Sequence, residues 1–369
     1  MTISVGMRSL AVAFPRVIRN NDYYRQKYPD IVAEVESKAL ARLWKSSEDV
    51  KDLFSLEMQK FLGDPFRGCV ERRVLGPDET ALSLETRAAA DALKAAGLEP
   101  GDIDLVIVAS FLPDQVGVGN APRVAGALGM RCAAWSLETA CSGSVVGFQT
   151  AAGLVQSGQY ENVLVVVSCS YSRYADERDT LSWFLGDGAG AFVVGRVEDG
   201  YGFLGGKSIH SADTCGTFSY ELEIDDATGK PKIAMTAAPH TGRVLAETAT
   251  HYVRECCLGA AKAADVSLSD IDFFIFHTPV PWFAPFAARA LEIDPAKTVC
   301  TNRYYANTGP ALMPGNLHYA VENGRIRKGD LVLLQSIGSA SSAGAVVMRW
   351  NEAPLGPSPF SPRHVVTDE

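Results

Sequence analysis

The sequence predicts an α/β protein made of two similar halves. The segment DIDLVIVAS at residues 102–110 is matched by DIDFFIFHT at residues 270–278, and ENVLVVVS at 161–168 is matched by GDLVLLQS at 329–336. Both pairs are separated by the same 168 residues (270 minus 102, and 329 minus 161). Two independent matches at one spacing indicate an internal duplication. Near-continuous apolar strands that alternate with helices also indicate sheets covered on both faces.

The same order of elements is expected in each half: an Ala-rich helix, a buried strand, a second helix, a second strand, and a small-residue run into a third strand. The first helix and the three strands lie at residues 85–97, 102–110, 161–168 and 187–195 in one copy and at 255–266, 270–278, 329–336 and 341–350 in the other. We therefore divide the chain into an N-terminal half, residues 1–200, and a C-terminal half, residues 201–369. The segment 28–64 reads as an inserted amphipathic helical region, which either covers the core or serves as a substrate lid or partner surface.

Composition disfavours several classes of function. The 369 residues are 47% hydrophobic, which is enough to bury a large core, and the net charge of −9 disfavours binding to nucleic acid. No stretch approaches the roughly 20 apolar residues of a membrane span, and the N-terminus lacks a signal-peptide pattern. We expect a cytoplasmic protein without membrane association. The eight cysteines show no metal-ligand spacing, so no metal site is expected.

The run GDGAGA at residues 186–191 resembles a phosphate-binding loop. It precedes a strand, however, whereas a phosphate-binding loop opens a helix. Close packing of the backbone is therefore the preferred interpretation.

Cys141 is the candidate nucleophile. It lies in LETACSGSVVGFQ, where an extended stretch gives way to a small-residue turn and then to a helix. At a helix N-terminus, unpaired N–H groups and the helix dipole stabilise a thiolate, so we expect a lowered pKa for this thiol. A buried structural cysteine at a strand–helix junction is the alternative.

His277 and Asn307 complete a Cys/His/Asn set. His277 ends the apolar strand FFIFH and opens a loop, where functional residues often lie. By the 168-residue offset, Asn307 corresponds to Thr139, two residues before Cys141. The duplication therefore predicts that the two turns meet across a pseudo-twofold axis. A thiolate accepts an acyl group, while an imidazole and a carboxamide donate hydrogen bonds to a thioester carbonyl oxygen, so the set suits acyl transfer.

With these residues in place, the chain resembles the β-ketoacyl-acyl carrier protein synthase III group of the thiolase superfamily. The resemblance covers roughly residues 68–350, and the spacing from His277 to Asn307 also fits. The motifs that carry it are GCVERRVL (68–75), ETACSG (138–143), FLGDGAGAFVVG (184–195), FHTP (276–279), ANTGPALMP (306–314) and LVLLQSIGSASSAG (331–344).

This resemblance implies a five-layered αβαβα thiolase fold, a homodimer, and a route in which Cys141 is acylated by one thioester before a second substrate attacks. His277 and Asn307 would hold a malonyl thioester carbonyl. The backbone N–H groups of Cys141 and Ser339, the latter in the loop of residues 338–340, would form the oxyanion hole. No metal or redox cofactor is implied. The substrates would be thioesters of acyl carrier protein phosphopantetheine or of coenzyme A, with acyl carrier protein as a partner.

The sequence also departs from the family pattern. The tryptophan expected to grip coenzyme A is missing from FLGDPFR (61–67), and the loop after His277 reads TPVPWF where a polar, basic run is usual. Val116 stands where a bulky aromatic residue is expected, which would widen the acyl pocket. We assign Val116, Trp183 and Phe184 to the substrate pocket. These departures favour a specialised polyketide-type pathway over housekeeping fatty-acid initiation.

Other functions remain open at this stage. The acyl group could pass to an alcohol or amine without decarboxylation, or two β-ketoacyl chains could be joined. A papain-like hydrolase is disfavoured by the internal repeat, and a degradative thiolase by the absence of a cysteine after Cys300. A non-catalytic partner with a thiolase fold is the alternative outside enzymes, although such proteins typically lose the nucleophile.

Overall fold

Two main β-sheets organise the protein. The computed structural model describes residues 3–45, 52–115, 117–225, 229 and 231–359. The five strands of the first sheet run in the order β1 (Val5–Ala13), β7 (Asp187–Arg196), β6 (Asn162–Ser170), β4 (Leu105–Phe111) and β5 (Ala133–Ser136). The four strands of the second sheet run in the order β11 (Phe273–Phe276), β12 (Leu331–Ile337), β13 (Ser342–Arg349) and β8 (Gly202–His210).

The two sheets repeat one topology. In the first sheet β4 pairs parallel with β6, β6 pairs antiparallel with β7, and β7 pairs antiparallel with β1. In the second sheet β11, β12, β13 and β8 pair in the same sequence and the same directions. The matched segments of the sequence are therefore β4 with β11 and β6 with β12, which confirms the predicted duplication.

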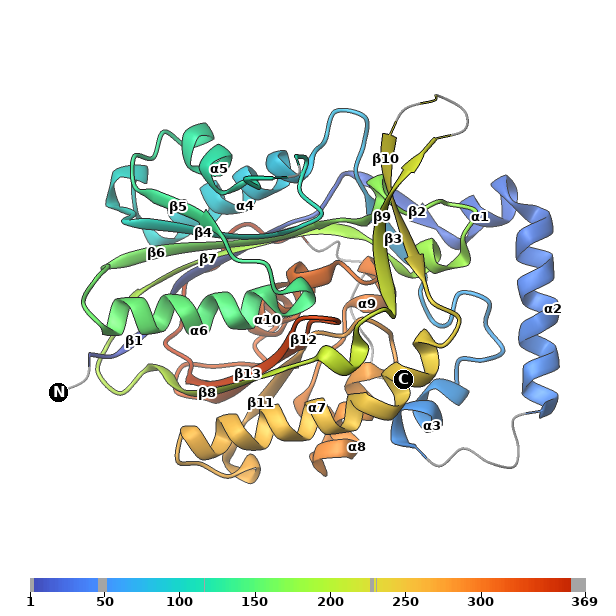
Figure 1. Cartoon of the computed structure of the whole chain (residues 1–369). Helices are drawn as coiled ribbons and strands as arrows, with labels where there is room; N and C mark the ends of the chain where they lie inside the picture. The colour runs from blue at the N-terminus through green and yellow to red at the C-terminus, as the bar shows by residue number, and fades with distance from the viewer. Residues whose placement is uncertain (1–2, 46–51, 116, 226–228, 230, 360–369) are drawn as a thin grey trace.

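Helices cover both sheets, giving the five layers visible in Figure 1. Two helices pack on the outer face of the first sheet, two lie between the sheets, and two pack on the outer face of the second sheet. In that order they are α4 (Ala81–Ala96) and α5 (Ala121–Ala127), α6 (Gly143–Gln156) and α10 (Leu312–Glu322), and α7 (Thr241–Ala263) and α8 (Phe283–Leu291). The predicted five-layered αβαβα fold is confirmed.

The central layer holds the largest core. Val145 and Phe148 of α6 and Met313 and Leu317 of α10 are fully buried against strands of both sheets. Each helix begins beside a short turn at one edge of this layer, where Cys141 and Asn307 lie. The packing of α6 and α10 therefore determines the position of both candidate residues.

Smaller elements surround this body. Strands β2 (Val17–Asn20) and β3 (Glu71–Val74) pair with each other, as do β9 (Phe218–Ile224) and β10 (Pro231–Ala237). The β9–β10 hairpin stands outside both main sheets (Figure 1). The remaining helices are α1 (Asn21–Lys27), α2 (Pro29–Lys45), α3 (Leu53–Gln59) and α9 (Asn302–Tyr305). Among the described residues, no helix is long and apolar enough to cross a bilayer.

Within segment 28–64, residues 46–51 lie outside the described part of the chain. Helix α2 lies at the periphery, whereas α3 packs against α8 (Figure 1). The rings of Phe54 and Phe286 meet edge to face at 5.2 Å, and Glu57 accepts a hydrogen bond from Arg289 at 2.8 Å. Phe54 also lines the cavity described below, so α3 covers part of the core and borders the candidate site at the same time.

The GDGAGA run packs closely, as its sequence context predicts. It enters β7 at Asp187, and a Cβ atom on Gly190 would lie 2.6 Å from Cγ of Pro314 in α10. On Gly186 a Cβ atom would lie 2.2 Å from the carbonyl oxygen of Tyr305. Glycine at position 190 allows the central helix α10 to approach the first sheet, and glycine at position 186 leaves room for the backbone at the end of α9.

We expect Gly190→Ala to lower the free energy of unfolding by roughly 1–3 kcal/mol, because the added methyl group must displace a proline ring. The matched control is Gly153→Ala in α6, where a Cβ atom would meet nothing within 4 Å. That change should raise stability by about 0.5–1 kcal/mol, since alanine loses less backbone entropy in a helix. Urea unfolding measures both. Equal effects of the two substitutions would contradict the packing role of Gly190.

Candidate active site

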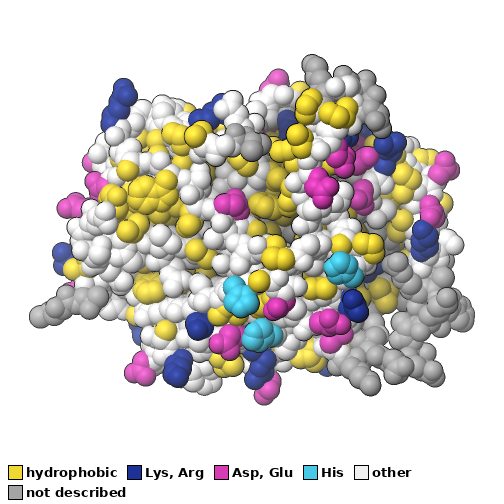
Figure 2. All heavy atoms as spheres, in the orientation of Figure 1, with side chains coloured by type: hydrophobic (Ala, Val, Ile, Leu, Met, Phe, Trp, Pro, Cys, Tyr) yellow, Lys and Arg dark blue, Asp and Glu magenta, His cyan; other side chains and the backbone are white. Residues whose placement is uncertain are grey.

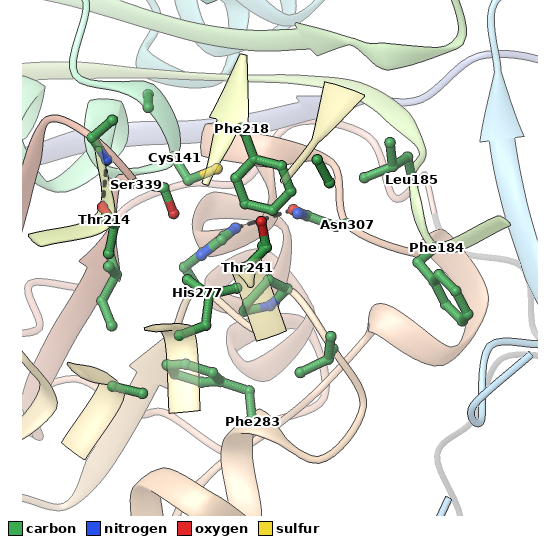
Figure 3. A pocket seen from close by; sticks show the side chains of 18 of the residues that line it. Cys141, Phe184, Leu185, Thr214, Phe218, Thr241, His277, Phe283, Asn307 and Ser339 are labelled. Carbon is green, nitrogen blue, oxygen red and sulfur yellow. Dashed lines mark hydrogen bonds between the residues drawn. The ribbon is translucent and has the colours of Figure 1, made fainter. Parts of the chain in front are cut away.

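A cavity of about 670 Å³ contains all three predicted reactive side chains. Cys141, His277 and Asn307 line it together with mostly apolar and aromatic residues. Figure 3 shows the three side chains converging, with the Cys141 sulfur above the His277 ring and Asn307 beside it. A few polar groups in a large apolar pocket are typical of a binding or catalytic site.

The turn before α6 presents Cys141. It is a short 3-10 helix, Ala140–Ser142, that leads directly into α6 at Gly143. Ala140 has a left-handed φ of 51°, which is uncommon for a residue other than glycine. Glu138 stabilises this turn, because its carboxylate accepts a hydrogen bond from the Ala140 N–H at 2.6 Å. The sulfur is thereby held at the N-terminus of α6, as the sequence predicts.

Burial dominates the ionisation of this thiol. It raises the pKa of Cys141 to about 12, and the nearby Glu138 carboxylate acts in the same direction. The dipole of α6 opposes this effect, but a helix terminus contributes at most about 2 kcal/mol, or roughly 1.5 pKa units. The expected lowering of the pKa is therefore wrong. At neutral pH the sulfur carries its proton.

His277 is fixed immediately after strand β11. Its backbone N–H donates to the carbonyl oxygen of Gln335 at 2.8 Å, which extends the β11–β12 pairing by one residue. The side chain is 2% exposed, and burial lowers the pKa of the imidazole to about 4, although its hydrogen bond to Asn307 opposes the shift. The ring is therefore neutral at physiological pH.

Asn307 is held at both its backbone and its side chain. Its N–H donates to the carbonyl oxygen of Phe184, and its own carbonyl accepts from the Gly186 N–H, both at 2.9 Å. The side-chain Oδ1 accepts from the Gly309 N–H at 2.9 Å and lies 3.1 Å from Nε2 of His277. Because Oδ1 can only accept, Nε2 must carry the imidazole proton. The Nδ2 group of Asn307 remains available to donate.

The loop at residues 338–341 borders the cavity next to Cys141. Thr214 accepts a hydrogen bond from the Ala340 N–H at 2.6 Å, and Ser211 accepts one from the Ser341 N–H at 3.0 Å. The Ser339 N–H makes no hydrogen bond within the described part of the chain. Figure 3 places Ser339 beside Cys141. The geometry therefore leaves one backbone donor of this loop unused, at the residue predicted for the oxyanion hole.

The three residues that the sequence assigns to the substrate pocket differ in where the structure places them. Phe184 lines the cavity. Trp183 does not, which corrects the prediction: its side chain is fully buried against Tyr24 and Phe66, and its carbonyl oxygen accepts from Nε of Arg72 at 2.9 Å. In the 3-10 helix Thr180–Phe184 these adjacent side chains point in different directions. Val116 lies outside the described residues.

Sequence reasoning missed several residues of the cavity wall. The β9–β10 hairpin contributes Phe218, Tyr220 and Met235, and the segment after β6 contributes Tyr171. No local pattern indicates that the hairpin covers a cavity. Tyr171 had a usable signal, because it follows the carboxyl end of a parallel strand, where ligands of α/β sheets commonly bind.

The lowered pKa of His277 predicts a pH-dependent contribution to stability. As pH falls from about 6.5 toward 4, the unfolded chain binds a proton at this imidazole before the folded chain does, so stability is present above this window and lost within it. Each pH unit within it should cost at most about 1.4 kcal/mol. His277→Gln lacks this contribution, so its stability difference from wild type should change between pH 7 and pH 5. Urea unfolding measures it.

His251→Gln is the control for this experiment. His251 is exposed on α7, so this variant measures the effect of removing an imidazole that is in contact with solvent. A difference between wild type and His277→Gln that stays constant with pH would contradict a buried, neutral His277.

Comparisons with known proteins identify the family of this chain. Residues 136–213 match the family model described as 3-oxoacyl-[acyl-carrier-protein] synthase III, and residues 261–350 match the model of its C-terminal part. A β-ketoacyl-[acyl-carrier-protein] synthase III of Brucella abortus (strain S19) is 34% identical over 289 residues, which cover 77% of this chain and 88% of the relative. One from Mesorhizobium japonicum is 32% identical over 295 residues, with the same coverage.

Solved structures show the same fold. The β-ketoacyl-[acyl carrier protein] synthase III of Thermus thermophilus is 25% identical and aligns over 94% of this chain and 99% of its own, with a TM-score of 0.76. A variant of OleA from Xanthomonas campestris is 22% identical and aligns over 95% of this chain and 99% of its own, with a TM-score of 0.74. The chain thus belongs to the 3-oxoacyl-[acyl-carrier-protein] synthase III family of acyl-transferring condensing enzymes, within the thiolase superfamily.

Proposed function

We propose that the enzyme forms an acyl thioester on Cys141 and condenses this acyl group with a malonyl or β-ketoacyl thioester. The observation that carries the proposal is the convergence of a thiol, a neutral imidazole and a carboxamide on one largely apolar cavity. These groups suit the two steps of the reaction. The thiol accepts an acyl group, and the imidazole and the carboxamide donate hydrogen bonds to a developing enolate.

In the first step, the Cys141 sulfur attacks the carbonyl carbon of the donor thioester. A carbon–sulfur bond forms to Cys141, the bond to the donor sulfur breaks, and the donor thiolate takes up the proton that Cys141 releases. Because burial keeps the resting thiol protonated, the proton must leave as the attack proceeds. The N–H groups of Cys141 and Ser339 would stabilise the tetrahedral oxyanion.

In the second step, His277 Nε2–H would turn from Asn307 Oδ1 to the carbonyl oxygen of the acceptor thioester, and Asn307 Nδ2–H would donate to the same oxygen. With a malonyl acceptor, the electrons of the bond to the carboxylate form an enolate as carbon dioxide leaves. The enolate attacks the acyl carbon, and the departing Cys141 thiolate takes a proton from water. A neutral imidazole suits a donor role, since it stabilises the enolate without giving up a full proton. The route needs no metal or redox cofactor.

The cavity lining supports an apolar acyl group as the first substrate. Aromatic and aliphatic side chains from the β9–β10 hairpin, the segment after β6 and helix α7 surround the reactive groups, and about 670 Å³ lies within the range of pockets for small organic ligands. This space is also compatible with joining two β-ketoacyl chains. A specialised polyketide-type role remains part of the proposal, alongside a role in fatty-acid synthesis.

Acyl carrier protein is the proposed carrier, because the relatives of this chain are named for that partner. Among the described residues that line the cavity, Arg67 is the only lysine or arginine. Its positive charge suits the phosphate of a phosphopantetheine arm. A coenzyme A thioester carries the same arm and remains a second candidate donor.

The open edge of β5 supports a homodimer. Strand β5 pairs with β4 on one side, and within the described residues no strand pairs with its other side. At the opposite edge of the sheet, β1 is covered by hydrogen bonds to Pro354 and Gly356. Trp135 is 39% exposed on β5, and Figure 2 shows hydrophobic side chains gathered over this region. Native proteins rarely leave such an edge uncovered, and a second copy of the chain would cover it.

Acylation of Cys141 is the first test. Incubation with acyl carrier protein and coenzyme A thioesters should add one acyl group to the wild-type chain by intact mass, and peptide mapping should place it on Cys141. Cys141→Ala should show no adduct. An adduct that survives this substitution, or none on wild type with any thioester, would refute the proposed nucleophile and would favour a non-catalytic thiolase-fold protein.

His277→Ala and Asn307→Ala should keep the adduct but reduce condensation on the order of 100-fold, as expected for the loss of one donor to a developing oxyanion. Product analysis with and without a malonyl donor separates the remaining outcomes. Carbon dioxide and a β-ketoacyl product indicate decarboxylative condensation, whereas an ester or amide formed without malonyl indicates transfer to an alcohol or amine.

We expect wild type to sediment as a dimer at micromolar concentration, with twice the mass of the chain. Trp135→Lys should shift the equilibrium toward monomer, because it places a charge at the proposed interface. The control is Leu258→Lys, since Leu258 is 44% exposed on α7, away from β5. A monomeric wild type, or identical behaviour of both variants, would contradict the proposed interface.

A further inference from the structure

Tyr171 lies against the proposed nucleophile. It begins a short 3-10 helix directly after β6, is 4% exposed, and lines the cavity. Its hydroxyl oxygen lies 3.7 Å from the Cys141 sulfur, within hydrogen-bonding reach of the larger sulfur atom. A buried tyrosine hydroxyl normally has a polar partner, and here that partner is the reactive sulfur.

Four contacts hold the phenol in place. The neighbouring Ser172 donates its N–H to Asp187 at 2.9 Å, and its hydroxyl donates to the same carboxylate. Asp187 also accepts from the Leu75 N–H at 2.7 Å, which ties the turn to the body of the first half. The Tyr171 ring packs edge to face on Phe111, with centroids 5.7 Å apart. The hydroxyl position is therefore set by a turn and a ring contact that do not depend on substrate.

Apart from the dipole of α6, the described residues around the sulfur offer little other support for negative charge. The titratable groups that face it are Glu138, Cys169, Tyr171, Tyr220 and His277. Burial and Glu138 raise the pKa of Cys141, whereas the Tyr171 hydroxyl lowers it. Cys169 is fully buried, and its thiol also interacts with the Tyr171 hydroxyl. A protonated Cys169 donating to the phenol oxygen would leave the phenol proton directed at Cys141.

We propose that the Tyr171 hydroxyl donates a hydrogen bond to the Cys141 sulfur whenever that sulfur is anionic, which makes Tyr171 a catalytic residue in addition to the Cys141, His277 and Asn307 set. The role of Tyr171 in the reaction cycle rests on the proposed function. The contact between the Tyr171 hydroxyl and the Cys141 sulfur does not depend on it.

The hydrogen bond acts at two points in the cycle. As Cys141 attacks the donor thioester, charge develops on the sulfur before the new bond is complete. When the enolate later attacks the acyl carbon, the bond to Cys141 breaks and its electron pair leaves on the sulfur. Tyr171 keeps its proton throughout both steps, and the departing thiolate still takes its proton from water. A hydrogen bond to a charged group stabilises it more than a bond between neutral groups does, so the effect is larger for the thiolate than for the thiol.

The test is the rate of alkylation of Cys141 by iodoacetamide at pH 8, followed by peptide mass spectrometry. Exposed Cys215 serves as an internal reference within the same chain. In Tyr171→Phe we expect a tenfold smaller thiolate fraction, partly offset by a more nucleophilic thiolate, so the net rate should fall about threefold. Tyr174→Phe is the matched control, because it removes a tyrosine hydroxyl close to the same turn, where that hydroxyl donates to the carbonyl oxygen of Pro113 and does not line the cavity. It should leave the rate unchanged.

A fluorotyrosine at position 171 provides a second variant that retains the ring and the hydroxyl. Its phenol is a stronger donor, so Cys141 should alkylate faster than in wild type. Equal Cys141 rates in wild type, Tyr171→Phe and the fluorotyrosine protein would overturn the proposal.

Turnover supplies an independent readout. In Tyr171→Phe, departure of the Cys141 thiolate should slow, so the fraction of acylated enzyme at steady state should rise relative to Tyr174→Phe. An unchanged or lower fraction would count against the second role of Tyr171. Because alkylation needs no acyl substrate, failure of wild type to accept any thioester would refute the proposed function and leave the alkylation test of Tyr171 intact.

Discussion

Helices α6 and α10 share one apolar core with strands of both sheets, and the cavity depends on this packing. Their N-terminal turns carry Cys141 and Asn307, so the positions of a sulfur and a carboxamide follow from how methyl groups and rings interlock in the central layer. Glycines such as Gly190 let α10 approach the first sheet. Because protein interiors are close-packed, a shift of either helix would be transmitted directly to the reactive groups.

The two titratable groups of the Cys141, His277 and Asn307 set are uncharged at neutral pH. Burial keeps the thiol of Cys141 protonated and the imidazole of His277 neutral. Such a site avoids the large cost of holding a buried ion pair before substrate arrives. Charge then develops only as bonds rearrange, at positions where N–H and O–H donors are already fixed. The proposed donors Ser339, His277 and Tyr171 follow the ends of three different strands, β12, β11 and β6, so the proposed site draws on both halves of the chain.

Much of the fold and part of the site could be predicted from the sequence. The duplication was visible because parallel strands buried on both faces leave long apolar runs, and the Cys141, His277 and Asn307 turns follow such runs or precede helices. The orientation of Trp183 could not be predicted. Adjacent residues of a 3-10 helix point in different directions, so Trp183 packs in a hydrophobic cluster while its neighbour Phe184 lines the cavity. The pKa of Cys141 was predicted wrongly. The sequence indicates the helix that follows Cys141, but it does not show which side chains bury the thiol. Those side chains come from segments far along the chain.

The β9–β10 hairpin illustrates a separation between scaffold and specificity. It contributes Phe218, Tyr220 and Met235 to the cavity, yet its strands pair with each other and with neither main sheet. Substitutions on its inner face would change the room available to an acyl chain without disturbing the five packed layers. If the proposed function holds, the hairpin is therefore the part of the cavity wall whose side chains can change the length of acyl group accepted while the two main sheets keep their strand pairing.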